Sequence, residues 1–125
     1  MPIIESRDHK VTHLSIVIPI YNEEEFLQEV VENILGEVAS KIEESFELIL
    51  VENGSRDKTL EVANDLANLK PEVIQVLKLP KPDYGRALRT GFQSARGVYI
   101  ANFDLDYWNV DFVCDALGFI DNLDL

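Results

Sequence analysis

Two aspartates one residue apart, Asp104 and Asp106, follow a short apolar run at residues 98–103 that is rich in strand-favouring side chains. If the strand stops at Asp104, the turn that follows brings both carboxylates to the carboxyl edge of the sheet, where open α/β sheets bind ligands. Two carboxylates held together repel, and a hard divalent cation relieves the repulsion while keeping coordination positions for phosphate oxygens. The pattern predicts a platform for a cation and a diphosphate. The alternative is a pair of solvated acids after an edge strand, because an Asp-x-Asp triplet alone is a weak signal.

The length of 125 residues allows one domain, and a surplus of acids gives the chain a formal net charge of -12. That charge argues against nucleic acid as a partner, and against anionic lipid as a partner of the bulk surface. An anionic substrate would therefore need a local positive centre, which is either a cation or a few placed arginines.

Three features of the sequence bear on location. Cys114 is the single cysteine, so no disulfide can form within the chain, which fits a reducing compartment. The sequence has no apolar run of the ~20 residues that span a bilayer. The first ten residues lack the apolar core of a signal peptide. We therefore expect a cytoplasmic protein.

Four apolar segments are expected to be strands, and they lie at residues 14–20, 46–51, 73–79 and 98–103. The first two are almost continuously apolar, which is typical of strands buried on both faces of a parallel sheet. The third alternates more, so we place it nearer an edge of the sheet. The mostly polar residues 1–13 are expected to form a flexible arm before a domain at 14–125.

The segments between and after these strands are predicted to be helices. Asn22 is expected to cap the first helix with Glu25 as its capping-box partner, and Ser55 or Asp57 to cap the second. Arg86 falls near the start of the third helix, at the end of the sheet where an anion would sit. Strands that alternate with helices through right-handed crossovers give an α/β fold, a mostly parallel sheet with helices on both faces.

Four segments, in chain order, resemble the motifs of family 2 glycosyltransferases, which are inverting enzymes with the GT-A fold. Residues 15–24 (SIVIPIYNEE) resemble the opening motif, and residues 47–59 (ELILVENGSRDKT) look like the second motif. The glycines and alanines of residues 85–97 match the third, and residues 104–106 are similar to the metal-binding triplet. The resemblance covers residues 14–113, and dolichyl- or polyprenyl-phosphate sugar synthases are the nearest subfamily.

This resemblance implies a Rossmann-like sheet with strand order 3-2-1-4, and a nucleotide-sugar-binding half that is incomplete at its C-terminal end. It also implies a nucleotide-diphosphate sugar as donor, with Mg²⁺ or Mn²⁺ held by Asp104 and Asp106. The donor-binding residues that it implies are Pro19, Tyr21, Glu23, Glu52, Asn53, Arg86 and Asp104. The family's general base is expected beyond Leu125, so no catalytic residue is assigned within the chain.

The sequence departs from the family pattern at three places. The usual acid pair after the second strand is replaced by Glu52 and Asn53, which leaves the base preference open. The glycine-rich loop is reduced to residues 83–85 (DYG). Trp108 stands where some relatives have a polar third metal contact, which predicts a thinner coordination shell.

The leading hypothesis is metal-dependent, inverting transfer of a sugar to an acceptor such as polyprenyl phosphate. Such a protein would be peripheral at a membrane through regions absent from this chain. The alternative is a shortened nucleotide-sugar-binding module without transferase activity. A receiver-type signalling domain is disfavoured because it needs an acid pair after the first strand, where this chain has residues 19–21 (PIY). Exposed apolar residues of the last segment, such as Phe112, Leu117 and Phe119, are expected to permit homo-oligomers.

Overall fold

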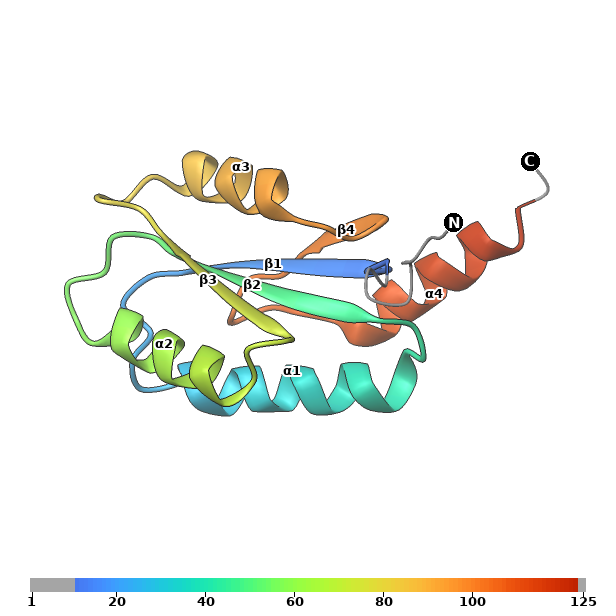
Figure 1. Cartoon of the computed structure of the whole chain (residues 1–125), viewed down its shortest axis with the longest axis horizontal. Helices are drawn as coiled ribbons and strands as arrows, with labels where there is room; N and C mark the ends of the chain where they lie inside the picture. The colour runs from blue at the N-terminus through green and yellow to red at the C-terminus, as the bar shows by residue number, and fades with distance from the viewer. Residues whose placement is uncertain (1–10, 124–125) are drawn as a thin grey trace, which may run out of the picture.

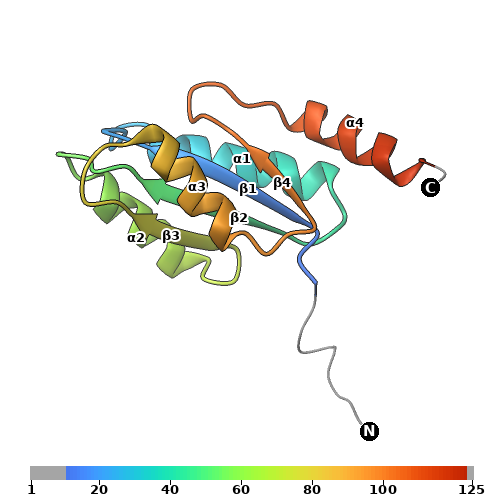
Figure 2. The same cartoon turned by 90° about the horizontal axis from the view of Figure 1, so that it is seen from above.

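Four parallel strands form the centre of the fold, in the spatial order β3-β2-β1-β4 (Figures 1 and 2). The computed structural model describes residues 11–123. The strands are β1 (Leu14–Ile20), β2 (Phe46–Glu52), β3 (Ile74–Lys78) and β4 (Tyr99–Asn102). The strand order 3-2-1-4 is thus confirmed, with the alternating third strand at an edge as its pattern predicted.

Helices cover both faces of this sheet, as predicted. They are α1 (Leu27–Lys41), α2 (Thr59–Leu69), α3 (Tyr84–Ser94) and α4 (Val110–Asp121). In Figure 1, α3 lies on one face of the sheet, and α1 and α2 lie on the other. The fourth helix, α4, packs against α1 beside the β4 edge. Within residues 11–123, none of the helices has both the length and the apolar character needed to cross a membrane.

The central strands β1 and β2 are buried on both faces because their side chains contribute to two separate cores. The larger core lies under α1, α2 and α4, and it includes alternate residues of β1 such as Ile16 and Ile18. The smaller core lies under α3, where Val17 packs with Ile49 and Val51. Successive residues of a strand point to opposite faces of the sheet, so a continuous apolar run contributes side chains to both cores.

A polar group built on the buried side chains of Ser15 and Glu47, at the amino ends of β1 and β2, fixes the start of β4. Ser15 Oγ donates to the Glu47 carboxylate over 2.6 Å and accepts from the Gly97 amide over 2.8 Å. Arg96 donates to the same carboxylate from its backbone (2.8 Å) and its guanidinium (3.0 Å). Burial opposes ionisation of Glu47, but these hydrogen bonds outweigh it and hold the pKa of the carboxyl below its usual value. We name this set the Ser15–Glu47–Arg96 group.

The predicted capping box at the start of α1 is wrong. The helix begins at Leu27, and its N-cap Phe26 makes no side-chain cap hydrogen bond. Asn22 instead has a φ of 52°, and its side-chain oxygen accepts from the Arg56 amide over 2.9 Å. The Asn22 side chain, which the local sequence predicts to cap the helix, therefore bonds to the loop after β2 instead.

The predicted cap of α2 is also wrong, because the N-cap is Lys58, which makes no side-chain cap hydrogen bond. Asp57, one residue earlier, still accepts from the Thr59 amide over 2.9 Å. Ser55 Oγ does not cap the helix, because it accepts from the Asn22 amide over 2.8 Å.

The ends of the chain are described in part. Residues 1–10 of the predicted arm lie outside the described residues. The Thr12 and His13 carbonyls accept hydrogen bonds from the amides of Val98 and Tyr99, at the start of β4. At the other end, Phe112 and Phe119 are 69% and 68% exposed on α4, as expected. Leu117 is only 7% exposed, so its predicted exposure is wrong: it lies on the helix face that joins the larger core.

Candidate functional site

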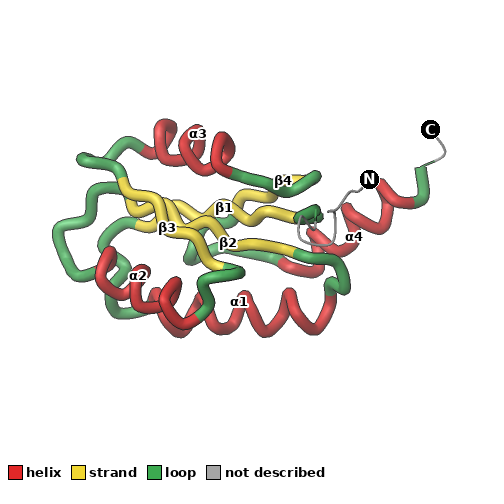
Figure 3. The backbone as a smooth tube through the Cα atoms, in the orientation of Figure 1, coloured by secondary structure: helices red, strands yellow, loops and turns green. Residues whose placement is uncertain are grey.

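The carboxyl ends of β1 and β4 open into one pocket of about 270 Å³. In Figure 3 the loops that follow β1 and β2 lie at the same end of the molecule. The strand order reverses between β1 and β4, and open α/β sheets bind ligands at such a switch point. The pocket is lined by Pro19, Ile20, Tyr21, Glu23, Asn53, Tyr84, Asp104, Leu105 and Asp106. Most of the residues singled out from the sequence are thus brought together.

The turn after β4 presents the two aspartates at the pocket. The Phe103 amide donates to the Val17 carbonyl over 2.9 Å, which ties the chain to β1 just beyond the end of β4. Asp104 and Tyr107 then exchange backbone hydrogen bonds of 3.0 and 3.3 Å. Phe103 and Leu105 are buried, each 5% exposed, and the aspartates that alternate with them, Asp104 and Asp106, line the pocket.

Acidic side chains from three segments of the chain interact electrostatically at this edge. Burial, and then the charges of Asp106 and Asp57, raise the pKa of Glu23. The Glu23 amide is held by Thr59 Oγ1 over 2.7 Å, which joins the loop after β1 to the start of α2. Carboxylate oxygens that repel one another are the donor set that Mg²⁺ and Mn²⁺ prefer. The chemistry of these residues therefore fits a hard divalent cation beside Asp104 and Asp106.

The pair Glu52 and Asn53 organises the turn after β2. Both oxygens of Glu52 accept from the Ser55 amide, over 3.0 and 3.1 Å, and the residue is 3% exposed. Asn53 Oδ1 accepts from the Asp83 amide over 2.7 Å. Asn53 borders the pocket, whereas Glu52 is not among its lining residues. Buried groups that accept hydrogen bonds within a turn are explained by the turn itself.

Arg86 lies in the first turn of α3, and it is not among the residues that line the pocket. Its backbone amide donates to Asp83 Oδ1 over 3.0 Å, so Asp83 caps the helix. The Arg86 side chain is exposed and makes no hydrogen bond with another described residue. The structure therefore does not bring Arg86 into the pocket.

Tyr84 lines the pocket, although it was not singled out from the sequence. Its phenol donates to Asp104 Oδ1 over 2.9 Å. This hydrogen bond, followed by burial, raises the pKa of Tyr84. A signal was present in the sequence: reading Asp83 as an N-cap would have started the helix at Tyr84 and placed that side chain at the carboxyl edge.

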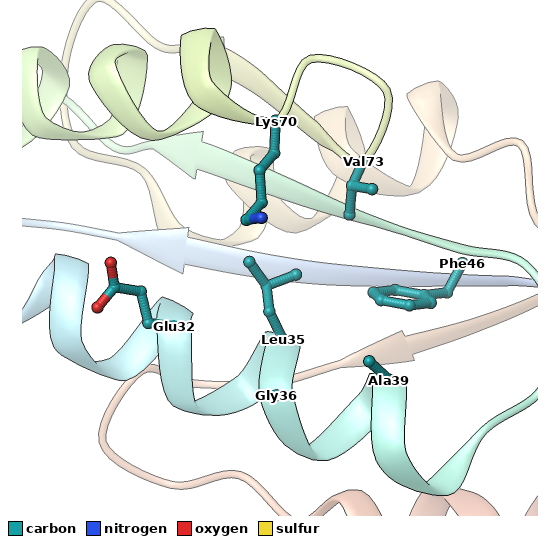
Figure 4. A pocket seen from close by; sticks show the side chains of 7 residues that line it. All are labelled: Glu32, Leu35, Gly36, Ala39, Phe46, Lys70 and Val73. Carbon is teal, nitrogen blue, oxygen red and sulfur yellow. The ribbon is translucent and has the colours of Figure 1, made fainter.

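Two other features lie away from this edge. A larger pocket of about 510 Å³ lies between α1, α2 and the start of β2, and Figure 4 shows Leu35, Phe46 and Lys70 at its wall. Its lining is largely apolar and contains none of the residues predicted for the site. A group of possible metal ligands, His13, Glu44 and Asp121, has its atoms within 4.8 Å of one another, but both acids are exposed. Exposed acids at such distances are common without an ion, so we assign neither feature a role.

Comparison with known sequences gives a consistent family. A model of glycosyl transferase family 2 matches residues 15–124. The undecaprenyl-phosphate 4-deoxy-4-formamido-L-arabinose transferase of Proteus mirabilis is 33% identical over 102 residues, which cover 80% of this chain and 31% of that protein. The protein of the same name from Pectobacterium atrosepticum is 37% identical over 101 residues, covering 79% of this chain and 30% of that protein. The chain spans about a third of the length of these curated relatives.

Solved structures give the same fold. The crystal structure of S. aureus TarS 1-349 in complex with UDP has a TM-score of 0.70 and 26% identity, covering 88% of this chain and 32% of that one. The mannosyltransferase PcManGT from Pyrobaculum calidifontis, in complex with GDP-Man and Mn²⁺, has a TM-score of 0.69 and 21% identity. The matched region covers 84% of this chain and 31% of PcManGT. At 21% identity, this similarity shows the fold alone.

Proposed function

The chain belongs to glycosyl transferase family 2, and on that premise we propose that its pocket binds a nucleotide-diphosphate sugar together with a divalent cation. The proposed reaction is inverting transfer of the sugar to an acceptor. One observation carries the proposal: the loop after β1, the turn after β2 and the Asp104–Asp106 turn line a single pocket at the switch point of the sheet.

Each segment of the pocket has a part in holding the donor. Pro19, Tyr21 and Glu23 present the loop after β1 to the nucleotide, and Asn53 borders the same space from the turn after β2. The pocket volume of about 270 Å³ is slightly below the usual range for a complete ligand site, which suits contact with a part of the donor. TarS, which shares the fold, was solved with UDP and with UDP-GlcNAc, which supports a nucleotide sugar as the ligand.

Asp104 and Asp106 would hold Mg²⁺ or Mn²⁺ against the diphosphate. When bound, such a cation stabilises the charge that develops on a departing nucleoside diphosphate. Negative charge around the pocket makes a cation necessary for binding an anionic donor. The chain carries a net charge of -12, and the pKa of Glu23 is raised by burial and by neighbouring carboxylates. Without a cation, an anionic donor would be repelled from the pocket.

The proposed acceptor is a polyprenyl phosphate, as the names of the bacterial relatives suggest. In the transfer, an acceptor oxygen bonds to the anomeric carbon while the bond from that carbon to the diphosphate breaks. The nucleoside diphosphate leaves with the bonding electrons. A phosphate acceptor is already ionised near neutral pH, so it needs no general base to remove a proton. Such an acceptor is held in a membrane, so the transfer would take place at the membrane surface.

Calorimetry with UDP and with GDP, each in Mn²⁺, in Mg²⁺ and after chelation, tests the donor site. We expect binding with either cation for at least one nucleotide, and at least about tenfold weaker binding after chelation. The variants Asp104→Asn and Asp106→Asn should weaken cation-dependent binding by a similar factor. Asp65→Asn, an exposed site on α2, is the matched control and should bind like the parent. Equal affinity with and without a cation would rule out the proposed platform.

A further inference from the structure

We propose that Tyr84 is a positioning residue of the cation site, which holds Oδ1 of Asp104 so that the other carboxylate oxygen faces the cation. The inference rests on the proposed function, because it assigns Asp104 to a cation. The observation behind it is the 2.9 Å hydrogen bond from the Tyr84 phenol to Asp104 Oδ1, across 20 residues of sequence.

The backbone position of Tyr84 is fixed by two neighbouring loops. Tyr84 is the first residue of α3, and the preceding Asp83 caps the helix by accepting from the Arg86 amide. Asp83 is itself fixed, since its amide donates to Asn53 Oδ1 over 2.7 Å. The turn after β2 therefore sets the position of the helix start, and with it the origin of the tyrosine side chain.

Backbone contact between the same two loops reinforces this arrangement. Gly54 has a φ of 73°, a left-handed conformation that glycine adopts without steric cost. A Cβ at Gly54 would lie 2.6 Å from the carbonyl carbon of Lys81, so the two loops pack backbone against backbone. With so little clearance, the loop before α3 has no room to move toward the turn.

Burial does not require the hydrogen bond to Asp104. Tyr84 is 50% exposed, so water could satisfy its hydroxyl, yet the phenol donates to the carboxylate. An ionised carboxylate has about four lone-pair positions, so one donor on Oδ1 leaves Oδ2 open to a cation. Hydrogen bonds from a second group to a metal-binding carboxylate fix its orientation, and losing one typically costs about 10- to 100-fold in metal affinity.

The test is the Mn²⁺ affinity of Tyr84→Phe, measured from the electron paramagnetic resonance signal of free Mn²⁺, with and without UDP or GDP. We expect affinity to fall by about 10- to 100-fold, with a melting temperature close to that of the parent. Tyr107→Phe is the matched control, because Tyr107 lies in the Asp104 turn, is 81% exposed, and its hydroxyl bonds to none of the described residues. This control should bind Mn²⁺ like the parent.

A double-mutant cycle separates positioning from general loosening of the fold. Asn53→Ala should weaken Mn²⁺ binding in the parent, because it releases the Asp83 amide that seats the helix start. In the Tyr84→Phe background the same change should have little further effect, since the contact it supports is already absent. Equal effects in both backgrounds would contradict a role through Tyr84.

The outcomes distinguish the inference from the proposed function. If Tyr84→Phe binds within about threefold of the parent while Asp104→Asn loses Mn²⁺, the inference is overturned and the cation site stands. If the parent itself binds no Mn²⁺, with or without nucleotide, the proposed function and the inference both fall. Tighter binding by Tyr84→Phe would show that the phenol competes with the cation, which also overturns the inference.

Discussion

At the carboxyl edge, hydrogen bonds join a backbone amide of one segment to a side chain of another segment that is distant in the sequence. Asn22 accepts from the Arg56 amide, and Asn53 accepts from the Asp83 amide. Glu23 is held through its own amide by Thr59 Oγ1. Each of these contacts links two loops, so the shape of the pocket is set by hydrogen bonds between loops as well as by the strands beneath them.

At the opposite end of the sheet, Glu47→Gln is expected to change how stability depends on pH. The pKa of Glu47 in the folded protein lies below its ordinary value of 4.5, so its charged hydrogen bonds stabilise the fold fully above that value. This contribution is lost as pH falls through the lower, folded pKa. The variant should therefore lose about 1.5–3 kcal/mol at pH 7, and this loss should become smaller as the pH falls below 4.5.

Urea unfolding at several pH values measures this difference. Glu37→Gln provides the control, because Glu37 forms a surface i,i+4 pair with Lys41 and such pairs contribute only about 0.3–0.5 kcal/mol. A loss for Glu47→Gln that stays constant from pH 7 to pH 3 would show that shape, and not charge, accounts for the role of Glu47.

At the scale of elements, the packing of α3 on the sheet depends on a glycine in its last turns. A Cβ at Gly91 would clash with Val17 Cγ1 and lie 3.1 Å from Val51 Cγ2. Both valines are fully buried, and β-branched side chains have little rotamer freedom to yield. Gly91→Ala should therefore destabilise the fold by about 1–3 kcal/mol, the usual cost of overpacking.

Gly36 and Gly118 are matched controls for this substitution. Both lie within helices, and a Cβ at either position would meet nothing within 4 Å. Alanine there should stabilise the fold by about 0.5–1 kcal/mol, since it restricts the unfolded chain and favours helix. Thermal unfolding of the three variants gives the comparison, and a stabilised Gly91→Ala would contradict the tight packing of α3.

The strands were largely predictable because their information is local and repeated, whereas their order was expected from the resemblance to family 2 glycosyltransferases. Apolar runs marked β1 and β2 as buried, and the more alternating pattern marked β3 as an edge strand. Parallel strands separated by helices bring their carboxyl ends to one edge, so the meeting of Pro19 with Asp104 followed from topology.

The remaining features depend on contacts that no local pattern encodes. Asn22 has the type and spacing of a helix cap, but its side chain bonds to a loop 34 residues later. Tyr84 reaches Asp104 only because Asp83, held by Asn53, sets where α3 begins. Glu52 has the type expected for a ligand contact, but its turn uses both of its oxygens. In each case tertiary geometry decided between two roles that the residue type allows.

At the scale of the whole molecule, the 125 residues should bind a donor but transfer its sugar poorly. They match only 31% of the Proteus mirabilis relative, and the resemblance places the family's general base beyond Leu125. For a hydroxyl acceptor, loss of a general base typically costs a factor of about a hundred to ten thousand. An ionised polyprenyl phosphate needs no base, so for that acceptor the cost is the loss of its positioning. We expect turnover well below about 1 per second, the low end of ordinary enzymes.

A turnover assay with sugar nucleotides, using polyprenyl phosphate and water as acceptors, measures this rate. Asp104→Asn serves as the control for background hydrolysis. Transfer to polyprenyl phosphate at about 1 per second or faster would mean that the acceptor site lies within these residues.

The Ser15–Glu47–Arg96 group and the ligand pocket lie at opposite ends of the same strands. The seven residues of β1 place them roughly 20 Å apart. Substitutions that are far apart and share no partners usually act additively on stability. This separation makes the chain evolvable. The loops at the carboxyl edge can change toward new donors while the Ser15–Glu47–Arg96 group at the amino ends continues to stabilise the fold. A mutant library confined to exposed positions of these loops, such as Tyr21, Glu24 and Arg56, would explore specificity with little loss of folded clones.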